Sequence, residues 1–475
     1  MNRYKYLLKN IGLLTLSNFA TKLLSFFLVP LYTNVLTTAE YGTYDLFNTT
    51  IGVLLPILTL NIQDAVMRFS MDARYSKKAI VTVATKYLLI SNLLVSGILV
   101  CNYVIDFSAV VKQFSFYFFL MFLAQSLSGI ITMYARGIDK ISDLSVSSVI
   151  SSAITIFLNI IFLIVFHFGL PGYFLANIIG PIFQCLYLII KAHVIQDIEW
   201  DGNFSNEEKI LTKYSVPLIS NSIAWWVNNA SDRYIVFFFC GLAENGIYSV
   251  ATKIPSILNI FQVIFNQAWS LSAVRDFDPD DRDGFFANTY RAYNCGMVIL
   301  CSIIISSDKL LAKFLYAKDF YIAWKYVPWL TIAILFGAIS GYVGGFFTAV
   351  KDSKIFAKST IYGAVTNIVL NLILTPIIGV LGASVATAIS YFEVWALRYW
   401  YSKRYIRIKI NLARDLISYA FLVIQASALL LESIDKSIFI CETFISVVIV
   451  ILYWNDIIAI FGKFKDSVHR KAIKK

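Results

Sequence analysis

Ionisable side chains inside apolar stretches are the residues of this chain that could carry chemistry. Lys22, Arg233 and Lys253 each lie in a stretch of apolar residues long enough to cross a bilayer. A charged side chain at the centre of a membrane helix costs about 2.5–3.5 kcal/mol on insertion scales, so such residues normally face a polar interior. Three cations with few acids beside them predict an internal cavity that attracts an anion.

Polar and aromatic residues accompany these cations in the sequence. Amide groups can hydrogen-bond to sugar hydroxyls and aromatic rings can stack on sugar rings, although Trp also anchors helices at the bilayer interface. The candidate cavity residues of this kind are Asn18, Asn221, Trp225, Asn229, Asp232 and Gln262. An alternative stays open, in which the cations are topology anchors or ion-pair partners and Lys253 reaches the interface with its long side chain.

The sequence offers no pattern for catalysis or for metal binding. Its three histidines, His167, His193 and His469, lie far apart, and its six cysteines include no CxxC pair. There is no phosphate-binding glycine loop that would indicate an ATP-driven transporter. We therefore expect no catalytic residue, no metal site and no cofactor, and the protein is not expected to be an enzyme.

Long apolar stretches must position the candidate residues. Hydrophobic residues make up 58% of the 475 positions and charged residues 15%, whereas a soluble domain is about 45–50% apolar and about 25% charged. The stretches are continuously apolar and each approaches the roughly 20 residues of a membrane helix. The predicted fold class is an all-α polytopic membrane protein with about fourteen transmembrane helices, at residues 11–35, 43–67, 82–105, 114–135, 145–167, 172–194, 214–239, 246–271, 288–307, 326–349, 355–376, 380–401, 413–432 and 438–461.

The net charge of +11 is explained by topology. Basic residues cluster in alternate breaks between the apolar stretches, which indicates the cytoplasmic side and not a nucleic-acid-binding face. This pattern predicts that both termini are cytoplasmic. The opposite breaks hold few basic residues, namely Lys112, Lys309, Lys313, Lys318, Lys325 and Lys436.

A six-residue segment occurs twice and organises the whole chain. Residues 39–44 read Ala-Glu-Tyr-Gly-Thr-Tyr and residues 243–248 read Ala-Glu-Asn-Gly-Ile-Tyr, an offset of 243 − 39 = 204. A repeat at this long a period indicates duplicated halves. Six spans in each half make these parallel repeats, and we expect Gly42 and Gly246 to centre two turns on the periplasmic side.

The repeat sets the predicted domain organisation. The expected parts are an N-terminal six-helix lobe (1–195), a cytoplasmic linker (196–213), a C-terminal six-helix lobe (214–405), and two additional helices with a basic cytoplasmic tail (406–475).

The segments Thr38 to Tyr44, Ser231-Asp232-Arg233-Tyr234 and Glu244 to Lys253 resemble those of polysaccharide biosynthesis proteins of the Wzx type. These are flippases of the multidrug/oligosaccharidyl-lipid/polysaccharide exporter superfamily. The resemblance implies two six-helix lobes in a V around a cationic cavity, at positions that Lys22, Arg233 and Lys253 match. It also implies alternating-access transport of an undecaprenyl-diphosphate-linked oligosaccharide, an O-antigen (lipopolysaccharide) or capsule unit, from the cytoplasmic to the periplasmic leaflet of a bacterial inner membrane.

The implied partners are the lipid-linked oligosaccharide, membrane lipids, a polymerase and other assembly proteins, without nucleic acid. The driving cation, H⁺ or Na⁺, is left open. Three alternatives also stay open: a drug/cation antiporter of the same superfamily, a peptidoglycan lipid-precursor flippase, and a membrane polysaccharide polymerase or glycosyltransferase.

Overall fold

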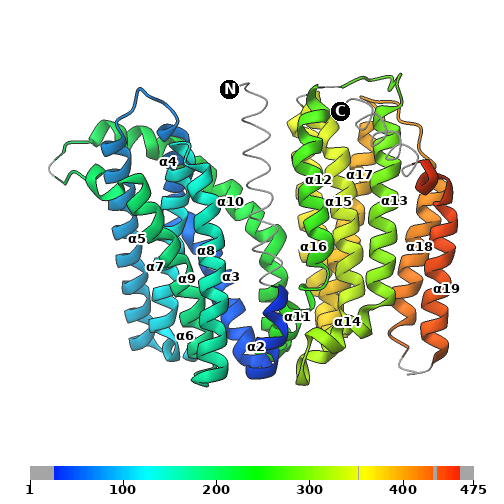
Figure 1. The fold of residues 1–475 in the computed structure, drawn as a ribbon, viewed down its shortest axis with the longest axis horizontal. Coiled ribbons are helices and arrows are strands. Elements are labelled where there is room, and N and C mark those ends of the chain that lie inside the picture. The colour runs from blue at the N-terminus through cyan, green and yellow to red at the C-terminus, as the bar shows by residue number, and fades with distance from the viewer. Residues whose placement is uncertain (1–25, 201, 276, 351, 432–435, 460–475) are drawn as a thin grey trace, which may run out of the picture. The chain divides into compact units, whose positions relative to one another are not determined.

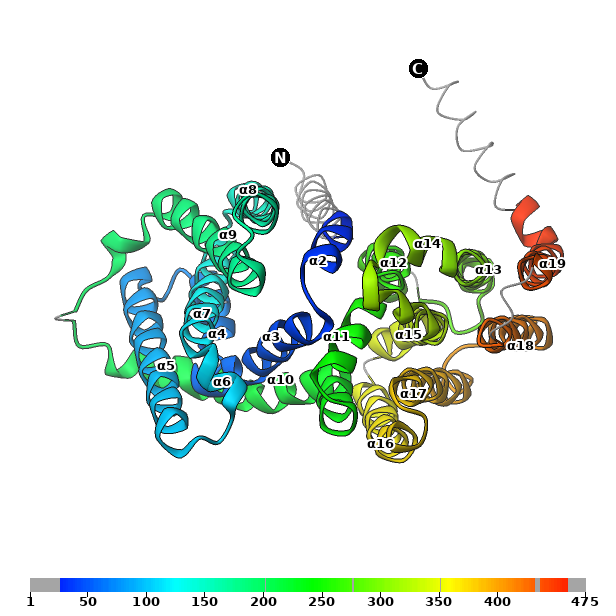
Figure 2. The same ribbon diagram turned by 90° about the horizontal axis from the view of Figure 1, so that it is seen from below.

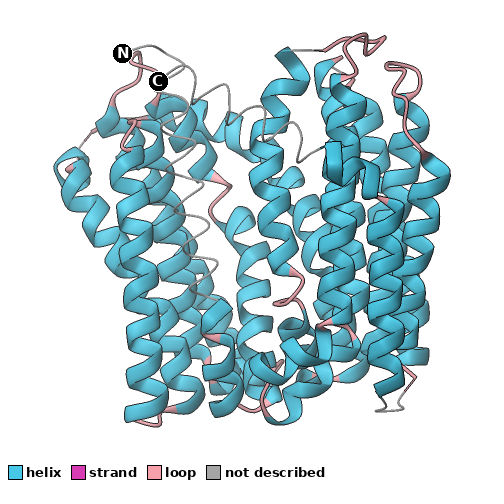
Figure 3. Ribbon diagram, turned by 45° about the vertical axis from the view of Figure 1, so that its right-hand side comes forward, coloured by secondary structure: helices cyan, strands magenta, loops and turns pink. Residues whose placement is uncertain are grey.

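The computed structural model describes residues 26–200, 202–275, 277–350, 352–431 and 436–459. All regular structure in these segments is helical (Figure 3), which confirms the predicted all-α class. The internal contacts divide the chain into two compact units, one of residues 1–234 and 242–246 and the other of residues 235–241 and 247–475. The predicted domain boundaries, with a linker at 196–213, stay a prediction.

The first unit is built from long helices that run alongside one another, among them α5, α7, α8 and α9 (Figure 1). Its buried centre holds Ile62, Val66, Ile80 and Tyr134. The elements, the last two of which reach into the second unit, are α2 (Val29–Val35), α3 (Thr38–Leu58), α4 (Ile62–Ser70), α5 (Lys77–Ile105), α6 (Ala109–Gln113), α7 (Ser115–Gly137), α8 (Ile141–Ile160), the π-helix η1 (Ile161–Val165), α9 (Gly169–Ala192), the 3₁₀-helix η2 (Val194–Asp197), α10 (Ser205–Cys240) and α11 (Leu242–Ala251).

Two of the predicted spans are broken helices. Helices α3 and α4 meet at an angle of 62°, because Leu60 and Asn61 both adopt a φ of +51°, a conformation that non-glycine residues rarely take. Helix α11 and the first part of α12 meet at 52°, at a turn that contains Pro255. The predicted spans 43–67 and 246–271 therefore each correspond to a bent pair of helices, which can together form one span.

The second unit continues with α12 (Ser256–Arg275), α13 (Phe285–Ser306), α14 (Asp308–Leu315), the 3₁₀-helix η3 (Lys318–Lys325), α15 (Val327–Ala349), α16 (Ser353–Ile378), α17 (Val380–Ser402), α18 (Leu412–Ala428) and α19 (Lys436–Leu452). Seen end-on, α13, α18 and α19 lie side by side at one edge of this unit (Figure 2). The last two are the helices that follow the second repeat.

Glycines bring α12 and α15 close together. Gly337, Gly341 and Gly345 recur every four residues along α15, and the side chains of α12 that face them are Gln262, Asn266 and Trp269. A Cβ atom on Gly345 would lie 2.6 Å from the indole nitrogen of Trp269. That nitrogen donates a hydrogen bond of 2.8 Å to the backbone oxygen of Tyr342. Small residues at this spacing allow membrane helices to pack at short distance.

Among the described residues, seven helices are long and apolar enough to cross a membrane, or up to ten if each bent pair is one span. This establishes a multi-pass membrane protein but does not confirm the predicted fourteen. The predicted spans 114–135, 326–349 and 380–401 agree closely with α7, α15 and α17. The predicted span 11–35 lies largely outside the described residues.

Candidate functional site

An ion pair joins α3 to α10 within the first unit. The Nε atom of Arg233 lies 3.0 Å from Oδ2 of Asp45, and the two side chains are 21% and 11% exposed. Asp45 lies near the start of α3, whose first turn is fixed by a capping box between Thr37 and Glu40. The cation of Arg233 is therefore largely neutralised by a carboxylate that sequence reasoning did not assign to the site.

Hydrogen bonds extend this contact along the two helices. The indole N–H of Trp226 donates to the backbone oxygen of Thr49 at 2.8 Å, and the hydroxyl oxygens of Thr50 and Tyr234 lie 2.5 Å apart. The rings of Trp226 and Tyr234 also pack edge to face. We call Asp45, Thr49, Thr50, Trp226, Arg233 and Tyr234 the α3–α10 seam; it holds Arg233 in a fixed, half-buried position.

The remaining predicted residues have different surroundings. Asp232 is 7% exposed, whereas Trp225 is 63% exposed. Asn221 is exposed, and Gln262 is half-buried near Gly337 of α15. Because Trp225 is so exposed, its position also fits the alternative of an interfacial anchor.

Lys253 lies in the turn between α11 and α12 and is half-buried. Among the described residues, no carboxylate forms an ion pair with it. Lys22 and Asn18 lie outside the described residues, as does the side chain of Asn229. A shared cavity for Lys22, Arg233 and Lys253 therefore stays a prediction.

The two copies of the repeated segment contact each other. A Cβ atom on Gly42 would lie 2.0 Å from the backbone oxygen of Leu242, and one on Gly246 would lie 2.0 Å from that of Thr38. Asn245 also donates a hydrogen bond of 3.3 Å to the backbone oxygen of Gly42. Each glycine thus faces the carbonyl four residues before the other, which is the reciprocal contact of a local two-fold relation.

This geometry corrects the expected turns at Gly42 and Gly246. Both residues are helical, in the first turns of α3 and α11. Glycine is required here because two backbones approach closely, and not because the chain reverses direction.

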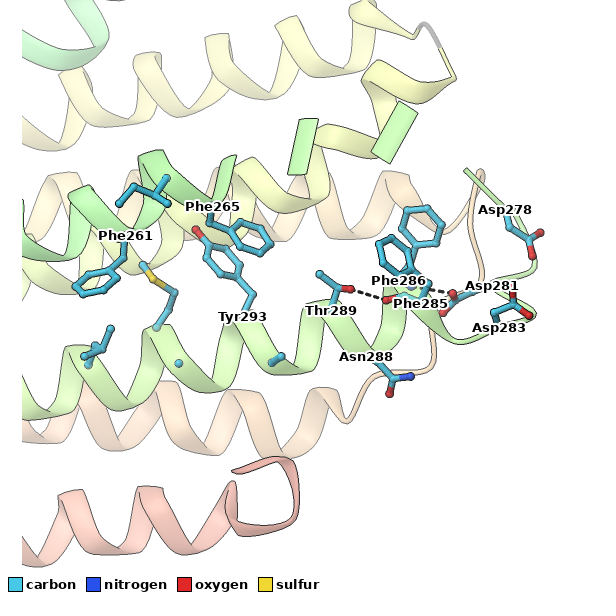
Figure 4. Close-up of a pocket in the computed structure, with 15 residues that line it drawn as sticks. Phe261, Phe265, Asp278, Asp281, Asp283, Phe285, Phe286, Asn288, Thr289 and Tyr293 are labelled. Atoms are coloured by element: carbon cyan, nitrogen blue, oxygen red, sulfur yellow. Dashed lines mark hydrogen bonds between the residues drawn. The ribbon is translucent and has the colours of Figure 1, made fainter. Parts of the chain in front are cut away.

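A large apolar cavity of about 1150 Å³ opens within the second unit (Figure 4). It is lined by side chains of α12 and α13 such as Phe261, Phe265 and Tyr293, and by Asp278 and Asp283 of the loop between these helices. None of the predicted site residues whose side chains the structure describes lines it. Acidic lining residues repel a diphosphate, so the cavity does not suit the anionic part of the expected substrate.

One further buried cation is not among the site residues predicted from the sequence. Arg398 of α17 is 6% exposed and donates to Ser359, to Thr360 and to the backbone oxygen of Ser340. Its guanidinium also stacks 4.1 Å from the ring centroid of Phe356. All three nitrogens are satisfied by neutral groups, so this residue ties α15, α16 and α17 together. The position of Arg398 inside an apolar run of the sequence was the signal that could have indicated its burial.

The fold is similar to that of solved membrane transporters. The structure titled lipid II flippase MurJ in an inward closed conformation aligns with a TM-score of 0.71, covering 95% of this chain and 99% of that chain at 14% identity. A multidrug resistance MATE family transporter of the MOP superfamily, in an inward-facing conformation, aligns with a TM-score of 0.58 over 88% of this chain and 96% of that chain at 14% identity. The fold of this chain is thus similar to that of these two solved membrane transporters.

Sequence comparison identifies the family. A stretch of 213 residues aligns at 22% identity with the probable low-salt glycan biosynthesis flippase Agl15 of Haloferax volcanii. The alignment covers 44% of each protein. The chain spans only 44 to 65% of the length of the curated relatives that it matches. The family model described as polysaccharide biosynthesis protein matches residues 7–270, more than half of the 475 residues. The chain belongs to this family of polysaccharide biosynthesis proteins.

Proposed function

We propose that the protein is a flippase that moves a lipid-linked oligosaccharide from the cytoplasmic to the periplasmic leaflet of a bacterial inner membrane. The observation that carries this proposal is the family match over residues 7–270, together with a flippase-like fold over 95% of the chain. A substrate attached to undecaprenyl diphosphate, such as an O-antigen or capsule unit, fits a family of polysaccharide biosynthesis.

The diphosphate is the part of this substrate that needs the protein most. It carries about two negative charges, which cannot enter an apolar medium without partners. Charge-assisted hydrogen bonds from Arg or Lys would offset the loss of hydration. We assign this role to Lys22, Arg233 and Lys253, with amide and aromatic residues around them contacting the sugars.

The ion pair between Arg233 and Asp45 adds a step to this mechanism. With Asp45 only 3.0 Å away, Arg233 is not free to bind an anion at full strength. The diphosphate must displace the carboxylate, and Asp45 takes the guanidinium back when the substrate leaves. Such an exchange weakens binding, which favours release on the second side of the membrane.

Complementation tests the function. In a strain that lacks its own flippase, the wild-type chain should restore surface polysaccharide of full length. Arg233→Ala and Lys253→Ala should reduce the product at normal expression, and Arg233→Lys should be milder than Arg233→Ala, because the charge is kept while the bidentate fork is lost. Lys313→Ala, at an exposed position, is the matched control. Full-length polysaccharide at wild-type levels from both alanine variants would show that these cations do not carry the substrate.

The fold alone leaves two related substrates to be separated experimentally. A peptidoglycan precursor and a cationic drug are carried by proteins of similar architecture. Parallel complementation of a strain that lacks its lipid II flippase, and a drug-sensitivity assay, distinguish them. Rescue or resistance in these assays, without restored polysaccharide, contradicts the proposal.

A further inference from the structure

The bundle of α13, α18 and α19 in the second unit contains buried polar groups at successive depths. Near its cytoplasmic end, as predicted from the loop charges, Asn294 donates to the hydroxyl of Tyr453 at 3.0 Å. Deeper in the bundle, the hydroxyls of Ser302 and Ser446 lie 2.9 Å apart, and both hydrogen-bond to the side chain of Gln425. These contacts show that α13 and α19 run antiparallel and fix their register.

Two carboxylates lie at the next level of this bundle. Asp308 is the first residue of α14 and Glu442 lies one turn before Ser446 on α19, so the register places them at a similar depth. Their exposed fractions are 0% and 1%. All four of their carboxylate oxygens are buried and have no hydrogen-bond partner among the described residues.

Few charged or titratable groups in the described part of the chain face this pair. Glu442 and Lys309 act electrostatically on Asp308, and Lys309 and the side chain of Gln425 act on Glu442. The ammonium of Lys309 lies 4.4 Å from the ring centroid of Trp324 in η3, and the phenol of Tyr321 interacts with Asp308. Helices α13 and α18 contribute the neutral side chains Ser302 and Gln425. Among the described residues, Lys309 is therefore the cation that acts on these two acids.

Another buried carboxylate of the same bundle shows the contrast. Asp415 is 0% exposed but accepts hydrogen bonds from Arg414 and from the hydroxyl of Tyr453. Arg414 also pairs with Asp456. Asp415 is thus paired with a cation through its Oδ1 atom, while its Oδ2 atom has no hydrogen-bond partner among the described residues. Asp308 and Glu442 differ in that neither oxygen of either carboxylate accepts a hydrogen bond there.

We propose that Asp308 and Glu442 form a proton-binding site that is occupied at neutral pH. An isolated ionised carboxylate in an apolar interior is far less stable than its neutral form, and two like charges close together favour proton uptake further. Ionisable residues inside membrane bundles commonly belong to proton relays. A bound proton removes one negative charge and supplies an O–H donor for an oxygen that otherwise has none. This site is independent of the identity of the transported substrate.

Infrared spectroscopy of the purified protein in lipid nanodiscs tests the proposal directly. The wild type at neutral pH should show the C=O stretch of a buried protonated carboxyl group, which disappears when the buffer is made strongly alkaline. The variant Asp308→Asn/Glu442→Gln should lose this band completely. Asp319→Asn, which removes an exposed carboxylate of η3, should keep it. An identical pH-dependent band in the wild type and the double variant would overturn the assignment.

A second measurement needs no variant. Dicyclohexylcarbodiimide reacts with protonated carboxyl groups in apolar surroundings, so mass spectrometry should find its adduct on Asp308 or Glu442 at neutral pH and several-fold less at alkaline pH. Absence of an adduct on both residues contradicts the proposal. If sodium, but not the control cation choline, reduced formation of the adduct at constant pH, the proposal would be overturned in favour of a sodium site. Neither measurement depends on transport, so failure here is distinguishable from failure of the proposed flippase function.

Discussion

Gly42 and Gly246 face each other across α3 and α11, each against the backbone carbonyl that lies four residues before the other. The two residues occupy the same position in the repeated segment. The two copies of the repeated segment therefore form a self-complementary contact, at which close approach of the two backbones excludes any side chain.

Substitution of either glycine by alanine should destabilise the protein. The added methyl would lie 2.0 Å from a carbonyl oxygen in both cases, and overpacking of this kind costs about 1–3 kcal/mol. Thermal unfolding in detergent, followed by tryptophan fluorescence, measures the effect. Gly97→Ala is the matched control, because nothing lies within 4 Å of its Cβ position in α5. If Gly42→Ala unfolds at the same temperature as Gly97→Ala, the helices do not cross as closely as described.

Asp45→Asn should increase the affinity for a diphosphate. The substitution removes the charge that competes for Arg233 while keeping the size of the side chain, and each tenfold gain corresponds to about 1.4 kcal/mol. Titration with a short-chain prenyl diphosphate measures the dissociation constant, for which we expect roughly a tenfold decrease. Arg233→Ala should bind more weakly than the wild type, and the double variant should behave like Arg233→Ala. A gain in affinity that persists in the double variant would exclude the exchange at Arg233.

The two copies of the repeated segment should be accessible from the same side of the membrane. Ala39 and Ala243 are equivalent and exposed, whereas Tyr41 and Asn245 are buried and unsuitable for labelling. In a cysteine-free background, an impermeant maleimide added outside the cytoplasmic membrane should label Ala39→Cys and Ala243→Cys. Ser76→Cys, exposed in a break with basic residues, should react only after lysis. Labelling of one copy but not the other from outside would show that the repeats are not like-oriented.

Tyr405→Phe should make the second unit more sensitive to acid. The hydroxyl of Tyr405 donates to Asp352 at 2.6 Å, and this hydrogen bond is the main reason that the pKa of Asp352 is below its ordinary value, followed by the backbone N–H of Ile355. A lowered carboxyl pKa stabilises the fold above the ordinary value, and this stabilisation is lost as pH falls through the folded-state pKa. The acid transition of the variant, followed by circular dichroism, should therefore move to higher pH. An unchanged transition would mean that this contact does not form in solution.

The sequence alone predicts those properties that depend on local composition. Continuous apolar stretches predicted helices such as α7, α15 and α17 within a few residues, because each needs only length and hydrophobicity. The break at Leu60 and Asn61 was not predicted, since non-glycine residues adopt a positive φ only where the surrounding structure imposes it.

Long-range contacts account for what the sequence missed in the candidate site. Asp45 and Arg233 are far apart in the chain and share no helical spacing, so nothing local indicated their ion pair. The repeated glycines were visible as a pattern, but a pattern cannot distinguish a tight turn from a close crossing of helices. Glu442 lies in an apolar run and Asp308 directly follows one, and only the packing of α13 and α19 shows that both lack hydrogen-bond partners among the described residues.

Transport in a purified system tests the central proposal most directly. Proteoliposomes that contain the protein and a prenyl-diphosphate-linked oligosaccharide are treated with a glycosidase that cannot cross the membrane, and the fraction of cleaved substrate is followed over time. We expect the wild type to bring the substrate molecules of the inner leaflet to the outer leaflet, where the glycosidase cleaves them. The variant Arg233→Ala/Lys253→Ala should do so at least about tenfold more slowly, because a barrier higher by about 1.4 kcal/mol slows a reaction tenfold. A wild-type rate equal to that of protein-free liposomes would contradict the flippase function, and equal rates for the wild type and the double variant would contradict the role of the two cations.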